Sequence, residues 1–243
     1  MKEKTAAIIV AAGRGSRMGT KIQKQYLKLL GKPILAYTLE AFEKSETDEI
    51  ILVVGEGEED YVTCEIIRPY GISRVTRVVA GGKERYESVW NGLQAVKEGI
   101  FPEEKNECFV LIHDGARAFI TPEQINFCIG QVREHQACVM GMPVKDTIKV
   151  VDSQEYTVST PDRSTLWQMQ TPQCFELTEI SSAYRKMFQS GAEKVTDDAM
   201  VMESFGERPV KMIRGSYDNI KVTTPEDLIL GEAILKEKIN IQN

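Results

Sequence analysis

Short apolar runs alternate along this chain with stretches of helical periodicity, and this alternation restricts the fold more than any other feature. Residues 5–11 and 49–54 are continuous apolar runs, typical of strands buried on both faces. Pro33 opens a stretch with apolar residues at three-to-four spacing, which predicts a helix. The pattern predicts an α/β fold with a doubly wound, mostly parallel sheet. Further strands are expected at residues 74–80, 108–113, 137–142, 210–214 and 219–222, and further helices at residues 85–98, 122–134, 176–190, 197–205 and from 224 onward.

One segment breaks the alternation. Residues 144–166 contain two short β-like runs joined by the polar residues 152–155, which predicts an inserted hairpin arm. A two-stranded hairpin is not stable alone in water, so its apolar side chains need a partner surface. A symmetric exchange of arms would supply that surface. We therefore expect one domain over residues 1–243 that carries the arm 144–166 and forms a homodimer. The apolar arm residues are Ile148, Val150, Val151, Val158 and Leu166.

Composition narrows the class of protein. Thirty Lys plus Arg against thirty-six Asp plus Glu give a net charge of −6, which argues against a non-specific nucleic-acid binder. No apolar run approaches the roughly 18 residues of a membrane span, and the first apolar run reaches Gly13 too soon for a secretory signal. The five cysteines include no C-x-x-C pair. We expect a reduced, cytoplasmic protein with no nucleic-acid or membrane partner.

A glycine-rich loop follows the first strand directly. In residues 11–19, Gly13 and Gly15 let the backbone approach an anion closely, so that successive N–H groups can bind phosphate oxygens. The loop matches neither a Walker loop nor G-x-G-x-x-G. Its cations, including Arg17 and nearby Lys24, favour a polyphosphate ligand. The alternative is a tight surface loop with solvated basic residues.

Three further clusters stand where strands should end. They are residues 81–88, 113–117 and 218–223. Ligands of open α/β sheets bind along the carboxyl edge of the strands, so these clusters are candidates for one site. Within them, Asp114 could orient hydroxyls or lie beside a cation, or it could simply cap a helix. His113 is more often a packed residue than a catalyst in such a context.

These clusters belong to an ordered set of motifs from residue 11 to residue 223. The set is AAGRGSRM, KQY, KPIL, GGKERYESV, HDGAR, PVKDTIK, TPDRSTLWQMQTPQ, VTDDA and DNIKVT. It resembles the 2-C-methyl-D-erythritol 4-phosphate cytidylyltransferase family of the non-mevalonate isoprenoid pathway. The resemblance implies a fold like that of nucleotide-diphospho-sugar transferases, a homodimer formed by interlocking arms, and a requirement for Mg²⁺. It also implies transfer of CMP from CTP to methylerythritol phosphate. Two departures stand out, because Gln23 and Ala118 replace prolines that are usual in the family.

The resemblance also implies roles for individual residues. Arg17 and Lys24 would stabilise charge at the α-phosphate, while Arg163 and Lys221 would position the attacking phosphate. Because Arg163 lies in the arm, it would serve the partner's site and make the active sites composite, although an ion pair within the arm is an alternative. Nucleotide contacts would come from Ala11, Ala12, Gly13, Gly15, Gly82 and Ser88. Contacts to the polyol phosphate would come from Asp114, Arg117, Thr147, Thr171, Thr196 and Asp218, for which caps and strand hydroxyls are the alternative. No protein ligand of Mg²⁺ is assigned.

Two other functions remain open at this point. A ribitol-5-phosphate cytidylyltransferase would perform the same chemistry on a longer polyol. A non-catalytic dinucleotide-binding Rossmann domain would need an acidic ribose-binding residue after the second strand. Glu56, Glu58, Glu59 and Asp60 are there, in a run more typical of a solvated turn. The cationic first loop also weighs against a dinucleotide.

Overall fold

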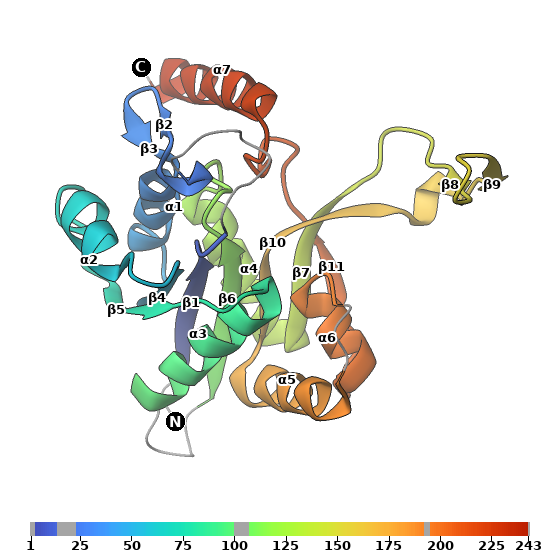
Figure 1. The fold of residues 1–243 in the computed structure, drawn as a ribbon, viewed down its shortest axis with the longest axis horizontal. Helices are drawn as coiled ribbons and strands as arrows, with labels where there is room; N and C mark the ends of the chain where they lie inside the picture. The colour runs from blue at the N-terminus through green and yellow to red at the C-terminus, as the bar shows by residue number, and fades with distance from the viewer. Residues whose placement is uncertain (1–2, 14–22, 100–106, 192–194, 243) are drawn as a thin grey trace.

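A seven-stranded sheet organises the computed structural model, which describes residues 3–13, 23–99, 107–191 and 195–242 (Figure 1). The strand order is β11-β7-β10-β6-β1-β4-β5. All neighbouring pairs are parallel except those of β10, which runs antiparallel to both β6 and β7. The predicted doubly wound, mostly parallel sheet is confirmed. The strands are β1 Lys4–Val10, β4 Glu49–Val54, β5 Val75–Ala80, β6 Cys108–Asp114, β7 Ala137–Pro143, β10 Trp167–Glu176 and β11 Lys211–Arg214.

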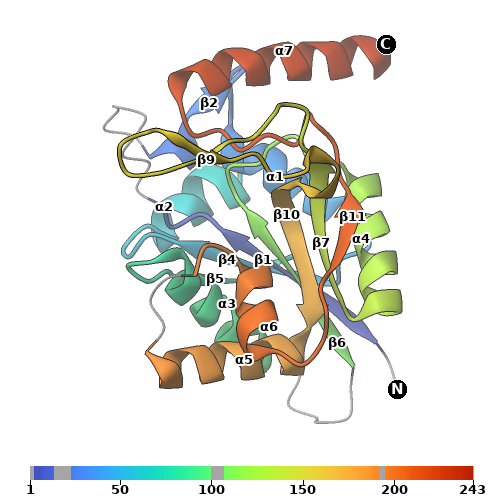
Figure 2. The same ribbon diagram turned by 90° about the vertical axis from the view of Figure 1, so that its right-hand side faces the viewer.

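Helices cover both faces of this sheet, as Figure 2 shows. Successive residues of β1 alternate between two apolar cores: Ala7 and Ile9 face one core, whereas Ala6 and Ile8 face the other. The first core is closed by α1 Ile34–Glu43 and α4 Pro122–His135. The second is closed by α3 Arg85–Gly99, α5 Leu177–Ser190 and α6 Asp198–Phe205.

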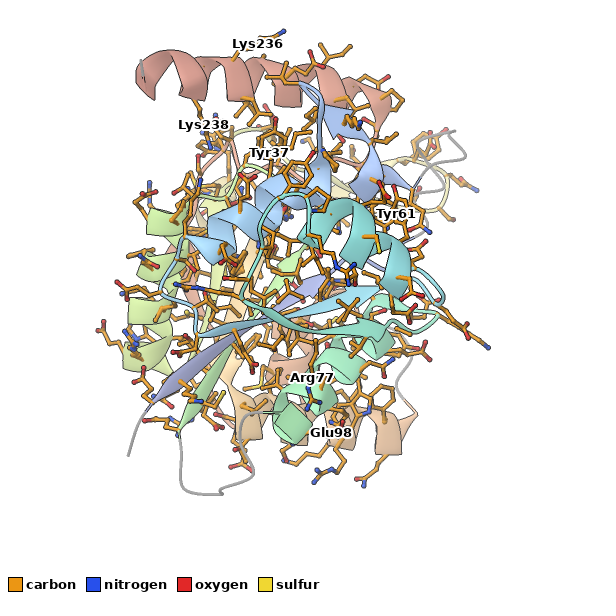
Figure 3. All side chains as sticks on the ribbon, turned by 90° about the vertical axis from the view of Figure 1, so that its left-hand side faces the viewer. Tyr37, Tyr61, Arg77, Glu98, Lys236 and Lys238 are labelled. Carbon is orange, nitrogen blue, oxygen red and sulfur yellow. The ribbon has the colours of Figure 1, made fainter. Side chains whose placement is uncertain are left out.

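A third, smaller core lies beyond the carboxyl edge of the sheet. There α7 Pro225–Gln242 packs on Leu29, Phe119 and Val222. Lys238, labelled in Figure 3, donates to the Phe119 carbonyl at 2.7 Å. Leu29 belongs to the small antiparallel pair β2 Lys28–Leu29 and β3 Lys32–Pro33. The final helix therefore holds in place the segments that lead to and from the carboxyl edge of the sheet.

Most predicted elements are confirmed to within two residues at either end, and side chains cap two of the helices. Thr121 and Gln124 form a capping box at the start of α4. Asp227 accepts from the backbone N–H groups of Thr223 and Thr224 at 2.7 and 2.8 Å and so closes the start of α7. Cys108 and Cys138 are buried, as expected of small core residues. All five cysteines are free, and no helix of the described residues is long and apolar enough to span a membrane.

Two predictions at this level are wrong. Residues 219–222 form no strand, because Val222 N–H bonds to Ala116 O at 2.9 Å and Asn219 N–H bonds to Ser216 O at 3.1 Å, which are turn and loop contacts. The acidic run after β4 is only partly a turn. Its later part begins the short helix α2 Glu59–Val62, which continues as a π-helical turn, Thr63–Ile67.

Strand β10 is an element that the sequence analysis missed. It lies in the middle of the sheet although it contains Pro172 and three glutamines. Proline cannot donate to a ladder, and the pairing with β7 is irregular between Met169 and Gln173. The buried glutamines are bonded outside the sheet: Gln170 donates to Ser216 O in a loop at 2.7 Å, and Gln173 accepts from Asp198 N–H at the start of α6 at 2.9 Å. These bonds replace the apolar pattern that marks a central strand.

The inserted hairpin is present and projects away from the sheet (Figure 1). It is shorter than predicted, with β8 Val150–Val151 paired antiparallel to β9 Thr157–Ser159. Tyr156 is 70% exposed and Val158 is 66% exposed. Ile148, Val150 and Val151 are exposed as well. The arm thus carries apolar side chains that its own chain does not cover. Its role in dimerisation stays a prediction, as does the division into one domain and an arm.

Candidate active site

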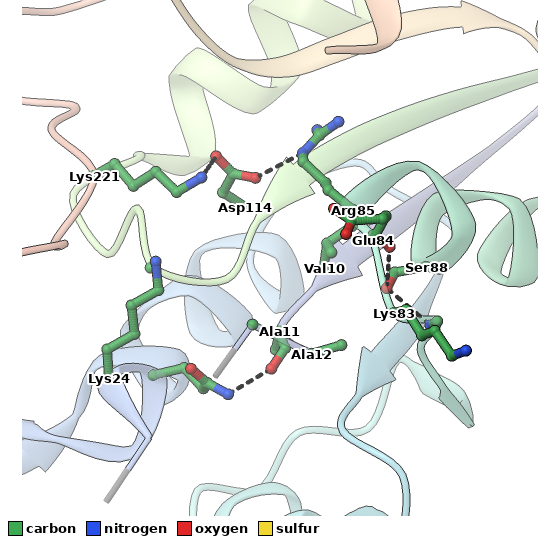
Figure 4. A pocket seen from close by; sticks show the side chains of 14 residues that line it. Val10, Ala11, Ala12, Lys24, Lys83, Glu84, Arg85, Ser88, Asp114 and Lys221 are labelled. Atoms are coloured by element: carbon green, nitrogen blue, oxygen red, sulfur yellow. Dashed lines mark hydrogen bonds and ion pairs between the residues drawn. The ribbon is translucent and has the colours of Figure 1, made fainter. Parts of the chain in front are cut away.

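A cavity of about 140 Å³ opens at the carboxyl edge of the sheet, between the ends of β1 and β6 (Figure 4). The end of β1 forms its floor, the turn Lys24–Tyr26 and the loop before α3 form two walls, and β6 contributes Asp114. The lining residues are Val10, Ala11, Ala12, Gly13, Lys24, Gln25, Gly82, Lys83, Glu84, Arg85, Ser88, Asp114, Ala116 and Lys221.

Buried Gln25 fixes the position of Lys24 relative to the first strand. Its side-chain amide donates to the carbonyl of Ala11 at 2.6 Å, directly after β1. Ala11 N–H in turn bonds to Val53 O at 2.7 Å, which holds this backbone against β4. Lys24 is half-buried and extends into the cavity from this anchored turn (Figure 4). The KQY motif thus places an ammonium group in the same cavity as Ala11, Ala12 and Gly13.

The second glycine loop is fastened by Ser88. Gly82 N–H donates to Ser88 Oγ at 3.0 Å, and the same hydroxyl lies 3.2 Å from Glu84 O, to which it donates. A side chain at Gly81 would collide with Ala12 Cβ and with Ser88 Oγ. The glycines are needed because strand end, loop and helix start meet here without space for a Cβ atom. In this arrangement the predicted nucleotide contact Ser88 shapes the loop with its hydroxyl.

Three cations surround the Asp114 carboxylate. Lys221 Nζ lies 2.9 Å from Oδ2, Arg85 Nε lies 3.4 Å from Oδ1, and Arg117 Nε lies 3.6 Å from Oδ2. Burial acts to raise the pKa of the Asp114 carboxyl, but the cations outweigh it and hold the pKa well below its usual range. Asp114 is therefore a carboxylate that organises positive charge, and it is not a proton donor at neutral pH.

His113 is a packed, neutral residue, in agreement with the prediction that it is a packed residue and not a catalyst. It is fully buried, and burial is the main cause that lowers its pKa to about 3. The Arg117 carbonyl can only accept, so Nε2–H of the neutral ring donates to it at 3.3 Å and Nδ1 accepts from the Thr171 hydroxyl at 2.9 Å. Thr171 Oγ1 in turn accepts from Asp114 N–H at 3.1 Å. The predicted polyol contact Thr171 is thus engaged inside the protein.

Two further cavities share walls with the first. One, of about 270 Å³, is lined by Arg85, Asp114 and Lys221 together with Arg117, Met169, Gln170, Thr171, Gln173, Thr196 and Asp197. The other, of about 720 Å³, shares Ala12, Gly13, Gly82 and Lys83 with the first and continues towards Gly55 and Glu58. We call the 140 Å³ space the central cavity, the 270 Å³ space the acceptor chamber and the 720 Å³ space the outer cavity. Two differently shaped molecules could thus meet at the central cavity.

The structure brings most predicted site residues together. The central cavity contains Ala11, Ala12, Gly13, Lys24, Gly82, Ser88, Asp114 and Lys221, and the acceptor chamber contains Arg117, Thr171 and Thr196. Gly15 and Arg17 lie outside the described residues. Thr147, Arg163 and Asp218 are described, are exposed and line none of the three cavities.

The sequence analysis missed several lining residues. Arg85 and Glu84 stand within the GGKERYESV motif and Asp197 stands within VTDDA, so the motifs contained the signal. Gln25 was not singled out because a glutamine in a loop carries no chemical signature. Its role depends on a neighbour that only the fold supplies.

One of the two departures from the family pattern, the one at Gln23, has a local explanation. Gln23 has φ −64° and ψ 142°, so it already holds the φ that proline would impose. Its side-chain amide bonds to Glu58 and to Gln25. Ala118 is buried beside Phe119 in the core under α7. The loop at residue 23 is therefore held by side-chain contacts where a proline ring would restrict it.

The mostly parallel sheet, the glycine loops at its carboxyl edge and the clustered cations define a nucleotidyltransferase-like α/β protein. Comparison with known proteins makes the assignment specific: the sequence model of the family described as IspD, 2-C-methyl-D-erythritol 4-phosphate cytidylyltransferase, matches residues 5–237. The chain belongs to the 2-C-methyl-D-erythritol 4-phosphate cytidylyltransferase family.

Individual relatives agree over nearly the whole chain. The cytidylyltransferase of Lachnoclostridium phytofermentans is 46% identical over 235 residues, which is 97% of each chain. That of Alkaliphilus metalliredigens is 48% identical over 237 residues, 97% of this chain and 94% of the relative. The crystal structure of 4-diphosphocytidyl-2C-methyl-D-erythritol synthase from Anaerococcus prevotii superposes with a TM-score of 0.82 at 34% identity and covers 96% of each chain. The resemblance drawn from the motifs is confirmed.

Proposed function

We propose that this protein transfers CMP from CTP to 2-C-methyl-D-erythritol 4-phosphate and releases pyrophosphate. The observation that carries the proposal is the central cavity, where Lys24 and Lys221 extend from different elements towards one space beside Asp114 (Figure 4). Family membership supplies the identity of the two substrates. The geometry supplies a place where two anions can be held together.

The reaction suits a site of this kind. A phosphate oxygen of the acceptor forms a bond to the α-phosphorus of CTP, and the bond from that phosphorus to the β-phosphate oxygen breaks with its electron pair. A phosphate monoester is largely ionised near neutral pH, so no general base is required. Both reactants are anions, and catalysis therefore depends on positioning and charge stabilisation. We assign Lys24, together with Arg17, to the α-phosphate, and Lys221 to the acceptor phosphate.

The cavities divide naturally between the substrates. The nucleotide occupies the central and outer cavities, which share Ala12, Gly13, Gly82 and Lys83 in their walls. The polyol occupies the acceptor chamber, where Arg117 and Thr196 line the wall. Asp114 and Lys221 belong to both the central cavity and the acceptor chamber, as reacting groups at a junction should.

A divalent cation enters this proposal with the nucleotide, as Mg–CTP. Within the described residues no group of three or more His, Cys, Asp or Glu side chains is arranged to hold a metal ion. The carboxylate of Asp114 is already compensated by three cations. Mg²⁺ prefers phosphate oxygens and water in nucleotide sites, which fits a cation that the substrate brings.

The arm leads us to include a homodimer with composite active sites in the proposal. Arg163 follows the hairpin and donates to Lys145 O at 2.9 Å, and it lies outside the three cavities of its own subunit. The exposed apolar residues of the arm favour contact with a second copy. A symmetric dimer would bring Arg163 to the partner's acceptor phosphate. We place the enzyme in the cytoplasm.

A substrate comparison tests the proposal. Initial rates are measured with CTP or UTP as donor and with 2-C-methyl-D-erythritol 4-phosphate or ribitol 5-phosphate as acceptor. We expect kcat/KM to be higher for CTP by about a hundredfold or more, because a site that bonds the N4 amino group leaves buried groups unpaired with UTP. Of the two acceptors, we expect turnover only with 2-C-methyl-D-erythritol 4-phosphate. Equal rates with both donors, or faster turnover of ribitol 5-phosphate, would contradict the assignment.

A further inference from the structure

Arg85 stands between the central cavity and the acceptor chamber and contacts two carboxylates. Its two terminal nitrogens donate to Asp198 Oδ1 and Oδ2 at 3.0 and 2.8 Å, and Nε lies 3.4 Å from Asp114 Oδ1. Arg85, Asp114 and Lys221 are the residues common to the walls of both spaces. The guanidinium group therefore links a fully buried carboxylate to the one that faces the reacting groups.

Asp198 has no direct access to substrate. Its side chain is 0% exposed, and it is not among the described residues that line the three cavities. Oδ1 also accepts from Tyr184 Oη–H at 2.6 Å, and the backbone N–H donates to Gln173 Oε1 at 2.9 Å. Tyr184 of α5 and Gln173 of β10 thus hold Asp198 in place at the start of α6.

A buried ion pair of this kind is poor evidence for a purely stabilising role. Removing two charges from water offsets much of their attraction, so an apolar pair of similar volume is often as stable. The fork geometry instead fixes the orientation of the guanidinium group, because one bond from each terminal nitrogen of Arg85 goes to Asp198, and Nε then faces Asp114. The arrangement limits where the Asp114 carboxylate can lie.

We propose that Asp198 and Arg85 are positioning residues for CMP transfer. Asp198 orients Arg85, and Arg85 holds the Asp114 carboxylate at the place where it binds Lys221 (Figure 4). Neither is a catalytic residue, since both act through Asp114 and Lys221. The inference rests on the proposed function, because Lys221 is there assigned to the acceptor phosphate.

The consequence of losing Asp198 follows from the remaining partners. Asp114 would be the one carboxylate still bonded to Arg85, and the guanidinium would turn to grip it with two nitrogens. That movement would displace the oxygen that Lys221 contacts. Displacing a positioning group by about 1 Å is enough to slow an enzyme by a factor of about 100.

The test measures kcat and the two KM values for Asp198→Asn, Arg85→Lys and the double variant, with CTP and 2-C-methyl-D-erythritol 4-phosphate. We expect kcat to fall by about tenfold to a hundredfold in each single variant, with the KM for CTP changing by less than about threefold. Because Asp198 acts through Arg85, the double variant should be no slower than the slower single variant, within about twofold. Effects that multiply in the double variant would overturn the proposal.

Two controls separate positioning from folding. Val96→Ala removes a buried contact on the same helix, α3, and should lower Tm while leaving kcat of the folded enzyme unchanged. Arg77→Lys alters a half-buried arginine that pairs with the exposed Glu98 at 3.6 Å near the far end of α3 (Figure 3), and should change neither quantity. If Asp198→Asn behaves like Val96→Ala, with lower Tm and wild-type kcat, the pair is structural and the inference fails. A wild-type enzyme without turnover would instead refute the proposed function.

Discussion

Removing the charge of Asp114 should destabilise the folded protein in a pH-dependent way. Asp114→Asn keeps the shape of the side chain but leaves three cations around a neutral amide. At an effective dielectric constant of 20, one charge pair at 3–3.5 Å is worth about 5 kcal/mol before burial is counted. Burial offsets much of this attraction, and breaking a buried pair costs about 3–5 kcal/mol in practice. Lys221 is 34% exposed, so solvent screens its contact, and we expect about 3 kcal/mol.

The pH dependence follows from the direction of the pKa shift. The pKa of the Asp114 carboxyl is lower in the folded state than its value of about 3.9 in an unfolded chain. Its contribution to stability is therefore fully present above about pH 5 and is lost as the pH falls through the folded-state pKa. The difference in free energy of unfolding between wild type and Asp114→Asn should be constant from pH 8 to pH 5 and shrink below about pH 4.

Urea unfolding monitored by circular dichroism measures this difference. The matched control is Glu98→Gln, since Glu98 also pairs with an arginine, at 3.6 Å, but is 74% exposed (Figure 3). We expect the control to cost less than about 0.5 kcal/mol at any pH. A cost below about 1 kcal/mol for Asp114→Asn at pH 7, or a difference that grows as the pH falls, would refute the view that Asp114 organises the surrounding cations.

Three further predictions concern turnover. Lys24→Ala should lower kcat by about a hundredfold or more with an unchanged circular dichroism spectrum. Lys24→Arg should not restore kcat, because a planar guanidinium group does not replace the compact ammonium group of lysine. Wild-type kcat in both variants would exclude Lys24 from the mechanism. Mixing Arg163→Ala subunits with Lys24→Ala subunits should restore activity if the active sites are composite, because one site of each heterodimer is then intact. If no activity returns although the subunits are shown to exchange, the active sites are not composite. Gln23→Pro should keep kcat within about threefold, because φ is already −64°, whereas a larger loss would show that the amide contacts to Glu58 and Gln25 are needed.

Much of the fold could be predicted because the local helix and strand signals agree with the pattern of buried apolar residues. Continuous apolar runs marked β1 and β4 since both faces of those strands are covered by helices. The start of α4 has a capping box of Thr121 and Gln124, two residues only three positions apart in the sequence. Signals of this kind depend only on neighbours in sequence, so they survive in a single chain.

The features that the sequence analysis missed depend on partners that are distant in sequence. Strand β10 carries Gln170 and Gln173, whose bonding partners lie in a loop 46 residues away and at the start of α6 25 residues away. Arg85 and Asp198 are 113 residues apart in the sequence, so no local pattern predicts their ion pair. Residues 219–222 looked like a strand because their apolar side chains serve the core under α7, where Val222 is buried, without a ladder beside them.

The central claim is CMP transfer to the acceptor phosphate, and the fate of the α-phosphate tests it most directly. The protein is incubated with Mg²⁺, 2-C-methyl-D-erythritol 4-phosphate and CTP that carries a radioactive phosphorus at the α-position, and the products are separated by chromatography and measured for radioactivity. We predict that the label appears in a cytidine diphosphate ester of the methylerythritol acceptor, with one unlabelled pyrophosphate released for each ester formed. Label in the pyrophosphate, or no ester while the folded protein binds CTP, would contradict the account.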